Sequence, residues 1–415
     1  MHKIKNLLLT NTSTKQILFK NTFWLMAGEV IAKGLLFIVT ISIVRSLGAE
    51  MYGKYASAVA FTAMFGVLVD FGLGTMLVQE LSHSGKAGAP KLFSSILSLK
   101  LVLAALTFLA IIIASAFAHF PPDVLRLVYL SGIYMLVQSF VLIFPALFQA
   151  YESMQFSFLV RSGSNILLCV FVLLALRFQL SAPGVLYAYI STAVLMLIFT
   201  LILVKKRLFS LHFKIDKSMI KHLLQQSWPL FLGNVCATLY ISIDTTMLSF
   251  MKSYKDVGIY QSSYMILYGF QTINLLHGAL FPRMAELYKN NRSGLRKLLL
   301  TIIPLSLIIL VPIVSFIGIF RNQIAHLIYG SRFVGVGDTM FILIIGGSIG
   351  HFSLYFSNLL LIKKRQIIGL FAVLFGLFVN VIANYFLISS FSYIGASIGY
   401  VSGYIAVLLF CILYR

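Results

Sequence analysis

Residues 101–118 read LVLAALTFLAIIIASAFA, a run without a charged side chain. A helix needs about 20 predominantly apolar residues to cross the hydrocarbon core of a bilayer, and the apolar character of this run extends back to Leu92. The run therefore predicts a membrane-spanning helix. Segments of the same kind recur along the whole chain. The predicted spans are residues 22–47, 55–78, 92–118, 124–148, 158–178, 182–204, 228–251, 262–281, 298–320, 339–362, 367–388 and 393–413.

The composition agrees with a membrane-embedded chain. Of the 415 residues, 60% are hydrophobic and 10% are charged, and the mean hydropathy is +0.97. A soluble domain carries roughly 25% charged residues, so this chain has too few charges to cover a globular surface in water. We therefore predict an all-α integral membrane protein of about twelve transmembrane helices.

The formal net charge of +21 comes from short clusters of Lys and Arg between the apolar runs. Loops on the cytoplasmic side of a membrane carry such an excess, whereas a nucleic-acid-binding domain gathers its charge on one folded surface. No nucleic-acid partner is therefore expected. Most of the 32 Lys and Arg residues fall on the same side of the predicted spans as the two termini. This distribution predicts that both termini are cytoplasmic.

Similar residues recur at nearly the same spacing in the two halves of the chain. Trp24 opens the first predicted span and Trp228 opens the seventh. Gly53-Lys54-Tyr55 closes the first predicted turn, and Gly258-Ile259-Tyr260 closes the turn after the seventh span. Two six-helix halves that start on the same side form parallel repeats, related by an axis along the membrane normal.

This repeat predicts the domain organisation. We expect an N-terminal six-helix lobe of residues 1–204, a basic cytoplasmic connector of residues 205–227, and a C-terminal six-helix lobe of residues 228–415. Two helical lobes around a central cavity are a common design for alternating access.

Four short stretches of the chain form an ordered set. They are RSLGAEMYGKY at residues 45–55, DFGLG at residues 70–74, FQAYESM at residues 148–154, and WPL at residues 228–230 followed by Tyr240, Asp244 and VGIY at residues 257–260. Together they resemble the pattern of the Wzx-type polysaccharide flippases, members of the superfamily that also holds the MATE drug exporters and the lipid II flippases. One departure is visible, because Gln79 and Glu80 stand where that family often has an arginine.

The resemblance implies a MATE-like fold and a transporter rather than an enzyme. Its implied substrate is an undecaprenyl-diphosphate-linked oligosaccharide, the repeat unit of O-antigen, capsule or a related polymer, moved across the bacterial cytoplasmic (inner) membrane. In a lipopolysaccharide pathway, glycosyltransferases and a polysaccharide polymerase are candidate partners, beside the membrane lipids. No cofactor is implied apart from a coupling ion, H⁺ or Na⁺.

Lys33 is the first candidate for binding this substrate. It lies roughly 17 Å along its helix, near the middle of the membrane, where a charge is costly and commonly marks a pathway. Glu29 precedes Lys33 by one helical turn, so both side chains project from one face. Either Lys33 contacts the phosphate while Glu29 takes up a proton as a gate, or the two form a self-neutralising pair that lines the bundle.

Three further cations are candidates for substrate contacts. Lys100 and Arg161 lie nearer the cytoplasmic side, where a headgroup would enter; alternatively, both extend to lipid phosphates at the interface. Arg45 ends the first span on the outer side, where it either assists release of the phosphate or interacts with the helix dipole.

Two carboxylates and two amides complete the candidate set. Asp70 lies beside glycines near the end of its span, which indicates a bend or packing point, with gating as the other interpretation. Asp244 lies deeper in the seventh span without a partner in its own helix, and serves either ion coupling or a salt bridge to the other lobe. Asn380 and Asn384 share a helix face, and are candidates for sugar contacts or for interhelical hydrogen bonds.

Two other functions remain open. A cation-coupled multidrug antiporter of the same superfamily would favour acidic and aromatic cavity residues over cationic ones. A membrane-embedded polysaccharide polymerase or ligase is less favoured, because such enzymes have a large extracytoplasmic loop and every predicted outer loop is short. Cys169, Cys236 and Cys411 lie inside apolar segments without metal-ligand spacing, so neither a metal site nor a catalytic residue is predicted.

Overall fold

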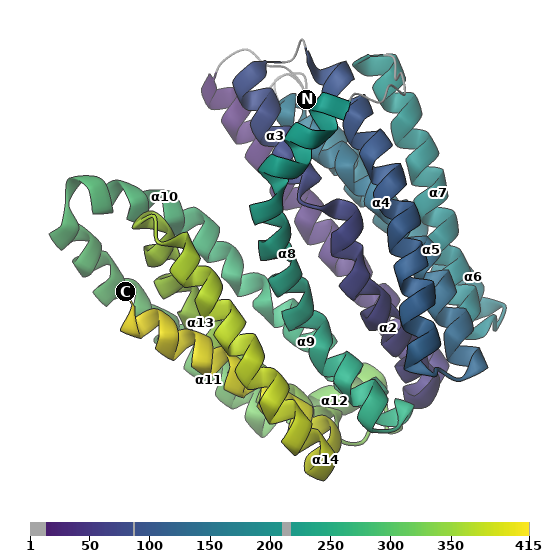
Figure 1. The fold of residues 1–415 in the computed structure, drawn as a ribbon. Coiled ribbons are helices and arrows are strands. Elements are labelled where there is room, and N and C mark those ends of the chain that lie inside the picture. Colours follow the sequence, from purple (N-terminus) through teal and green to yellow (C-terminus); the bar gives the residue numbers. More distant parts are fainter. Residues whose placement is uncertain (1–13, 86–87, 210–216, 415) are drawn as a thin grey trace, which may run out of the picture. The chain divides into compact units, whose positions relative to one another are not determined.

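The computed structural model describes residues 14–85, 88–209 and 217–414, without the side chains of residues 14–32, 84, 217 and 279. Over these ranges the chain is helical and forms no strand. The helices, drawn in Figure 1, are α2 (Thr14–Asp70), α3 (Leu73–Ser84), α4 (Ala89–Ala118), α5 (Pro122–Ala150), α6 (Met154–Arg177), α7 (Ser181–Arg207), α8 (Lys217–Met251), α9 (Tyr254–Phe270), the 3₁₀ helix η2 (Gln271–Asn274), α10 (Leu275–Asn290), α11 (Arg292–Ile319), α12 (Arg321–Tyr329), α13 (Val336–Ile362) and α14 (Gln366–Leu413).

Within the described part of the chain, 9 helices are long and apolar enough to cross a membrane. Two of these consist of two arms joined at a kink: α2 bends at Gly48 (φ 72°) and α14 bends at Ser392 (φ 51°). The eighth predicted span is present as α9 and α10, joined by η2. When each arm counts as one span, and α9 with α10 as one, the prediction of about twelve spans is confirmed.

The chain bends inside the first predicted turn and again inside the second predicted span. The sequence predicts a turn between residues 47 and 55, closed by Gly53-Lys54-Tyr55, and the kink lies within this range at Gly48; residues 49–70 then form one helical arm. Glycine adopts the positive φ at this kink without a steric penalty. Phe71 (φ 45°) and Gly72 (φ 73°) interrupt the second predicted span, so that Asp70 ends α2. The bend predicted from the glycines beside Asp70 is therefore confirmed.

The chain forms two compact units. Unit 1 consists of residues 1–46 and 58–238, and unit 2 consists of residues 47–57 and 239–415. The boundary thus falls inside α8, and the beginning of the second arm of α2 belongs to unit 2. The predicted boundaries of the two lobes and the connector stay a prediction. The two units are defined by the contacts within each of them and not by the sequence repeat.

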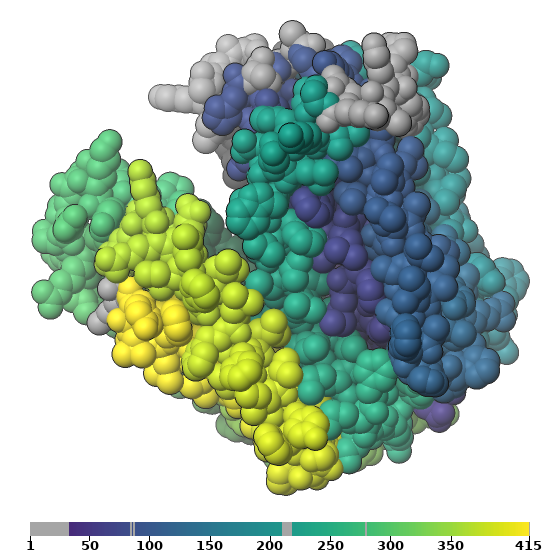
Figure 2. All heavy atoms as spheres, viewed as in Figure 1, coloured from purple at the N-terminus to yellow at the C-terminus, as the bar shows by residue number. Residues whose placement is uncertain are grey.

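In unit 1 the long helices α4, α5, α6 and α7 lie side by side (Figures 1 and 2). Their core includes Leu77, Phe93 and Phe144, and the rings of Phe93 and Phe144 are 5.5 Å apart. The outer face of α4 is also apolar, with Leu106 59% exposed. Lipid rather than water covers such a face at little cost, because the backbone polar groups are paired within the helices.

Unit 2 is built around α13 and α14, with α9 packed against both. Its core contains buried tyrosines, among them Tyr260, Tyr264 and Tyr400. The rings of Tyr264 and Tyr400 pack edge to face at 6.1 Å. Because a phenol hydroxyl needs a partner when it is buried, this core also has a hydrogen-bonding interior.

Two copies of one sequence motif meet inside unit 2. The motif is Gly-x-Tyr-x-Ser, read as GKYAS at residues 53–57 and as GIYQS at residues 258–262. In each copy the serine is buried and donates to the glycine carbonyl one turn earlier, at 2.8 Å for Ser57 and 2.7 Å for Ser262. Each serine hydroxyl thus has its hydrogen-bond partner within its own helix. The two motifs can therefore pack against each other without a hydrogen bond from these serines.

The glycines of the motif bring two backbones into contact. A Cβ atom at Gly53 would overlap the carbonyl oxygen of Tyr254, and one at Gly258 would overlap the carbonyl oxygen of Ala49. Ala49 precedes Gly53 by the same interval as Tyr254 precedes Gly258, so each copy offers equivalent atoms to the other. This reciprocal crossing joins equivalent residues of the two copies, as the predicted repeat would. We refer to it below as the glycine crossing.

Candidate functional site

Unit 1 contains a cavity of about 520 Å³ between α2, α5 and α8. Volumes of roughly 300–1,000 Å³ are typical of sites that bind small molecules. The described residues that line the cavity are Val59, Thr62, Ala63, Gly66, Val67, Asp70, Ser131, Tyr134, Met135, Gln138, Ser139, Leu142, Asn234, Ala237 and Thr238. All three helices contribute polar side chains to the wall of this cavity.

The helical repeat explains why these side chains converge. The lining residues of α2, from Val59 to Asp70, and those of α5, from Ser131 to Leu142, recur at alternating intervals of three residues and one residue. Such intervals place each set on one face of its helix. The α5 face is the more polar, because it includes Tyr134 and Gln138.

Asp70 and Lys100 form an ion pair at the edge of this cavity. Lys100 Nζ lies 3.4 Å from Asp70 Oδ1 and 3.4 Å from the carbonyl oxygen of Val69. The Lys100 side chain is completely buried, whereas that of Asp70 is 44% exposed and lines the cavity. The carboxylate therefore stands between the lysine and any molecule in the cavity, and it offsets the cost of burying the ammonium group.

Hydrogen bonds hold the polar wall in place. Thr62 Oγ1 lies 3.2 Å from Ser131 Oγ and joins α2 to α5, while Ser131 Oγ also donates to the carbonyl oxygen of Ala58. The ring of Tyr134 packs edge to face against Tyr189 at 5.0 Å. The wall is thus positioned before a ligand enters, which lowers the entropic cost of binding.

Asp244 lies at the centre of a second polar cluster, in the core of unit 2. It is fully buried and accepts hydrogen bonds from Asn384 Nδ2 at 2.6 Å, from Asn380 Nδ2 at 2.9 Å and from the Tyr260 hydroxyl at 2.9 Å. The two amides lie one turn apart on α14, as their shared helix face predicts. All three partners are neutral, so these contacts do not balance the charge of the carboxylate.

Two further polar atoms of this cluster are buried and have no hydrogen-bond partner among the residues that the structure describes. They are Asn384 Oδ1 and the hydroxyl of Tyr240. Gly399 and Gly403 make room for them, because a Cβ atom at either position would overlap or crowd these oxygens. Unsatisfied buried oxygens are rare. Together with the carboxylate, they form an oxygen-rich environment that suits a proton or a hard cation.

The other predicted site residues that the structure describes are not among those that line the cavity of unit 1. Lys33 is half-buried on α2, while Arg45, just before the kink of α2, and Arg161 on α6 are exposed. The side chain of Glu29 lies outside the described residues. The structure therefore brings together Asp70 with Lys100, and Asp244 with Asn380 and Asn384, and the roles predicted for all these residues stay predictions.

A histidine pair lies at the break between α9 and α10. His277 Nε2 is 3.2 Å from His351 Nδ1, which is in turn 2.8 Å from Asn274 Oδ1. Both rings are buried, and His277 packs edge to face against Tyr355 at 4.4 Å. The contacts fix the orientation of η2 against α13.

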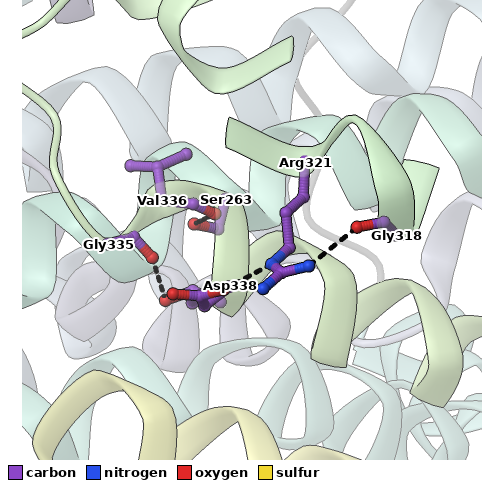
Figure 3. A network of polar contacts seen from close by, with 7 residues as sticks. Ser263, Gly318, Arg321, Gly335, Val336 and Asp338 are labelled. Atoms are coloured by element: carbon purple, nitrogen blue, oxygen red, sulfur yellow. Dashed lines mark hydrogen bonds and ion pairs between the residues drawn. The ribbon is translucent and has the colours of Figure 1, made fainter. Parts of the chain in front are cut away.

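A third polar network joins α11, α12 and α13 (Figure 3). Arg321 Nε lies 2.5 Å from Asp338 Oδ1, and its guanidinium also donates to the carbonyl oxygen of Gly318 at 2.9 Å. Ser263 of α9 donates to the carbonyl oxygen of Val336 at 3.1 Å. Because both ionic groups remain about half exposed, we interpret this network as a structural clamp on the short helix α12.

Sequence reasoning missed most of the cavity wall in unit 1. Thr62, Ser131 and Tyr134 were not singled out, since small polar residues are common in transmembrane helices and usually bond between helices. The sequence does contain one indication of this wall, because the lining residues of α2 and those of α5 follow the same helical spacing. This spacing predicts which residues share one face of a helix, whereas only the fold shows that the two faces meet.

Comparison with known proteins identifies a family. Residues 18–288 match the family described as polysaccharide biosynthesis protein. An uncharacterized membrane protein of Methanocaldococcus jannaschii is 21% identical over 435 residues, which cover 96% of this chain and 84% of that protein.

Two solved transporters have a similar fold. The lipid II flippase MurJ, in an inward closed conformation, aligns with a TM-score of 0.73 and 16% identity over 94% of this chain and 86% of its own. A multidrug resistance MATE family transporter of the MOP superfamily, in an inward-facing conformation, aligns with a TM-score of 0.69 and 15% identity over 92% of this chain and 93% of its own. The predicted MATE-like fold is therefore confirmed.

Proposed function

The chain belongs to the polysaccharide biosynthesis protein family, and from this membership we propose that it translocates lipid-linked oligosaccharides across the cytoplasmic membrane. The proposed substrate is an undecaprenyl-diphosphate-linked repeat unit of O-antigen or a similar polysaccharide, and the proposed mechanism is alternating access. Both similar structures belong to transport proteins, which supports transport over a polymerase or ligase activity.

The observation that carries the proposal is the cavity of unit 1, whose mainly apolar wall also contains polar side chains from three helices. A glycan has many hydroxyl groups and cannot cross hydrocarbon unless polar groups replace its water. Hydroxyl and amide groups of Tyr134, Gln138 and Asn234 line the cavity. These groups can accept and donate the hydrogen bonds that the sugar loses on leaving water.

The Asp244 cluster is proposed as the coupling site, for H⁺ or Na⁺. Its carboxylate is buried among neutral donors, and Asn384 Oδ1 lies beside it without a hydrogen-bond partner. An ion that binds there balances a buried charge, so its binding and release change the stability of unit 2. We further propose that both termini are cytoplasmic, on the basis of the Lys and Arg distribution.

The test measures lipid-linked repeat units in a host strain that lacks this chain. The proposal expects them to accumulate on the cytoplasmic face and to be cleared by the wild-type chain. Ala237→Phe, which places a ring in the cavity, and Lys33→Ala should each fail to clear them at equal membrane abundance. Ala105→Phe is the matched control, because Ala105 is exposed on α4, away from the cavity. Normal surface polymer without an accumulated intermediate would argue against a flippase.

One observation favours a second candidate, a cation-coupled multidrug antiporter. The carboxylate of Asp70 and the ring of Tyr134 both line the cavity, and acidic and aromatic groups suit an organic cation. This candidate expects loss of the chain to sensitise the host to ethidium and to leave the lipid-linked intermediates at normal levels. The flippase proposal expects the reverse for both measurements.

A further inference from the structure

The charges around the cavity of unit 1 indicate which part of a lipid-linked glycan it can hold. Among the described residues that line it, Asp70 alone has a charged side chain. The remaining polar groups are hydroxyls and amides, such as those of Thr62, Gln138 and Asn234. These groups suit sugar hydroxyls, whereas a diphosphate prefers lysine, arginine or backbone amides at a helix N-terminus.

Lys100 does not supply the missing positive charge. Its side chain is completely buried, and its Nζ atom already contacts Asp70 Oδ1 and the carbonyl oxygen of Val69. To reach a phosphate in the cavity, the ammonium group would have to leave its own counter-charge. A ligand in the cavity therefore meets the carboxylate of Asp70, which is 44% exposed, and not the lysine behind it.

We propose that this cavity binds the glycan part of the substrate and selects against acidic sugars, with Asp70 as the specificity-determining residue. The inference rests on the proposed function and narrows its substrate class. A neutral sugar donates charge-assisted hydrogen bonds to the carboxylate, and an amino sugar adds an ion pair. A sugar carboxylate places a like charge against Asp70, which disfavours its binding relative to a neutral sugar.

The Asp70–Lys100 ion pair determines which variant can test the role of Asp70. Removal of the Asp70 charge alone leaves Lys100 buried without a counter-charge, which can prevent folding. The informative variant is therefore Asp70→Asn/Lys100→Met, which removes both charges and approximately preserves the side-chain volumes. Glu286→Gln is the control for the loss of a carboxylate, because Glu286 is exposed in unit 2, where it pairs with Arg283.

The experiment compares three synthetic probes in proteoliposomes that contain the purified chain. The probes are undecaprenyl diphosphates that carry N-acetylglucosamine, glucosamine or glucuronic acid, and the measured quantity is the initial rate of translocation. We expect the wild-type chain and Glu286→Gln to move the two non-acidic probes at least roughly tenfold faster than the acidic one. The double variant should reduce this preference to within about twofold.

The outcomes separate this inference from the proposed function. Equal rates for the three probes with the wild-type chain would overturn the selectivity and leave the flippase proposal intact. A preference that survives in the double variant would overturn the role of Asp70. A wild-type chain that moves none of the probes would overturn both proposals.

Discussion

Asp70 in unit 1 and Asp244 in unit 2 are both carboxylates on membrane-spanning helices, yet their surroundings differ in every respect. Asp70 is 44% exposed, lines a cavity and pairs with the cation Lys100. Asp244 is fully buried and receives hydrogen bonds from neutral donors, among them Asn384. One carboxylate can meet a ligand, while the other is sealed inside a core of tyrosines.

The difference in partners has an energetic consequence. In unit 1 the two charges balance each other, so the carboxylate can stay ionised whether or not a ligand is present. In unit 2 the neutral donors stabilise the carboxylate without balancing its charge, and the balance has to come from a proton or a cation. We therefore expect unit 1 to respond to substrate and unit 2 to respond to ions.

The largest expected effect is on stability in unit 1. Asp70→Ala should lower the free energy of unfolding by about 3 kcal/mol, near the low end for a broken buried pair because Asp70 is partly exposed. Asp70→Asn/Lys100→Met should cost about 1 kcal/mol or less, since it leaves no buried charge unpaired. Thermal unfolding of the purified variants in detergent measures both. Equal losses in the two variants would show that the pair has no energetic coupling.

The corresponding change in unit 2 should have a smaller effect. Asn384→Ala removes one donor from Asp244 and should cost about 2 kcal/mol, the range for a hydrogen bond to a charged group. In the background of Asp244→Asn, the same substitution should cost about 1 kcal/mol, because the acceptor is then neutral. A double-mutant cycle on the unfolding free energies tests this difference. An identical cost in both backgrounds would contradict a charged acceptor at Asp244.

The third prediction separates the two carboxylates by function. Asp244→Asn keeps the shape of the cluster, so its stability should change by about 1 kcal/mol or less. We expect it to abolish the dependence of transport on a Na⁺ or H⁺ gradient, whereas Asp70→Asn/Lys100→Met keeps this dependence. Transport rates in proteoliposomes with and without imposed gradients provide the measurement. If the double variant loses the gradient response and Asp244→Asn retains it, the two assignments must be exchanged.

The smallest expected effect comes from an exposed ion pair. Arg283 and Glu286 lie 2.7 Å apart, and more than half of each side chain is exposed. Glu286→Gln should change the unfolding free energy by about 0.5 kcal/mol or less, because water screens such pairs. This value is the baseline for the Asp70 pair. A loss comparable to that of Asp70→Ala would mean that burial does not distinguish the two pairs.

The membrane spans could be predicted from the sequence because the information is local. An apolar segment such as residues 101–118 needs a bilayer regardless of its neighbours, and α4 accordingly runs from Ala89 to Ala118. The positions of the turns were harder to predict from the sequence. The predicted turn between residues 47 and 55 contains the kink at Gly48, but Gly53, which was predicted to close this turn, lies within a helix and is required by a helix contact.

The candidate sites could be predicted as residues but not as contacts. Lys100 was recognised as a charge within a span, yet its partner Asp70 lies 30 residues away, and only the packing of α2 against α4 makes them neighbours. Asp244 was recognised as buried and lacking a partner in its own helix. Its partners are the amides of Asn380 and Asn384, which lie 136 and 140 residues further along the chain. They contact Asp244 only because α8 and α14 pack together.

The glycine crossing has a consequence for substitutions in either copy of the motif. A surface that meets an equivalent surface about a two-fold axis is the defining feature of a symmetric homodimer interface. Here the two surfaces are the copies of Gly-x-Tyr-x-Ser at residues 53–57 and 258–262, and they belong to one polypeptide.

The two close approaches, Gly53 to Tyr254 and Gly258 to Ala49, use equivalent residues of the two copies. The glycine that one copy needs for close approach is the glycine that the other copy needs. A Cβ atom added at either position would therefore overlap the backbone of the other copy and separate both pairs.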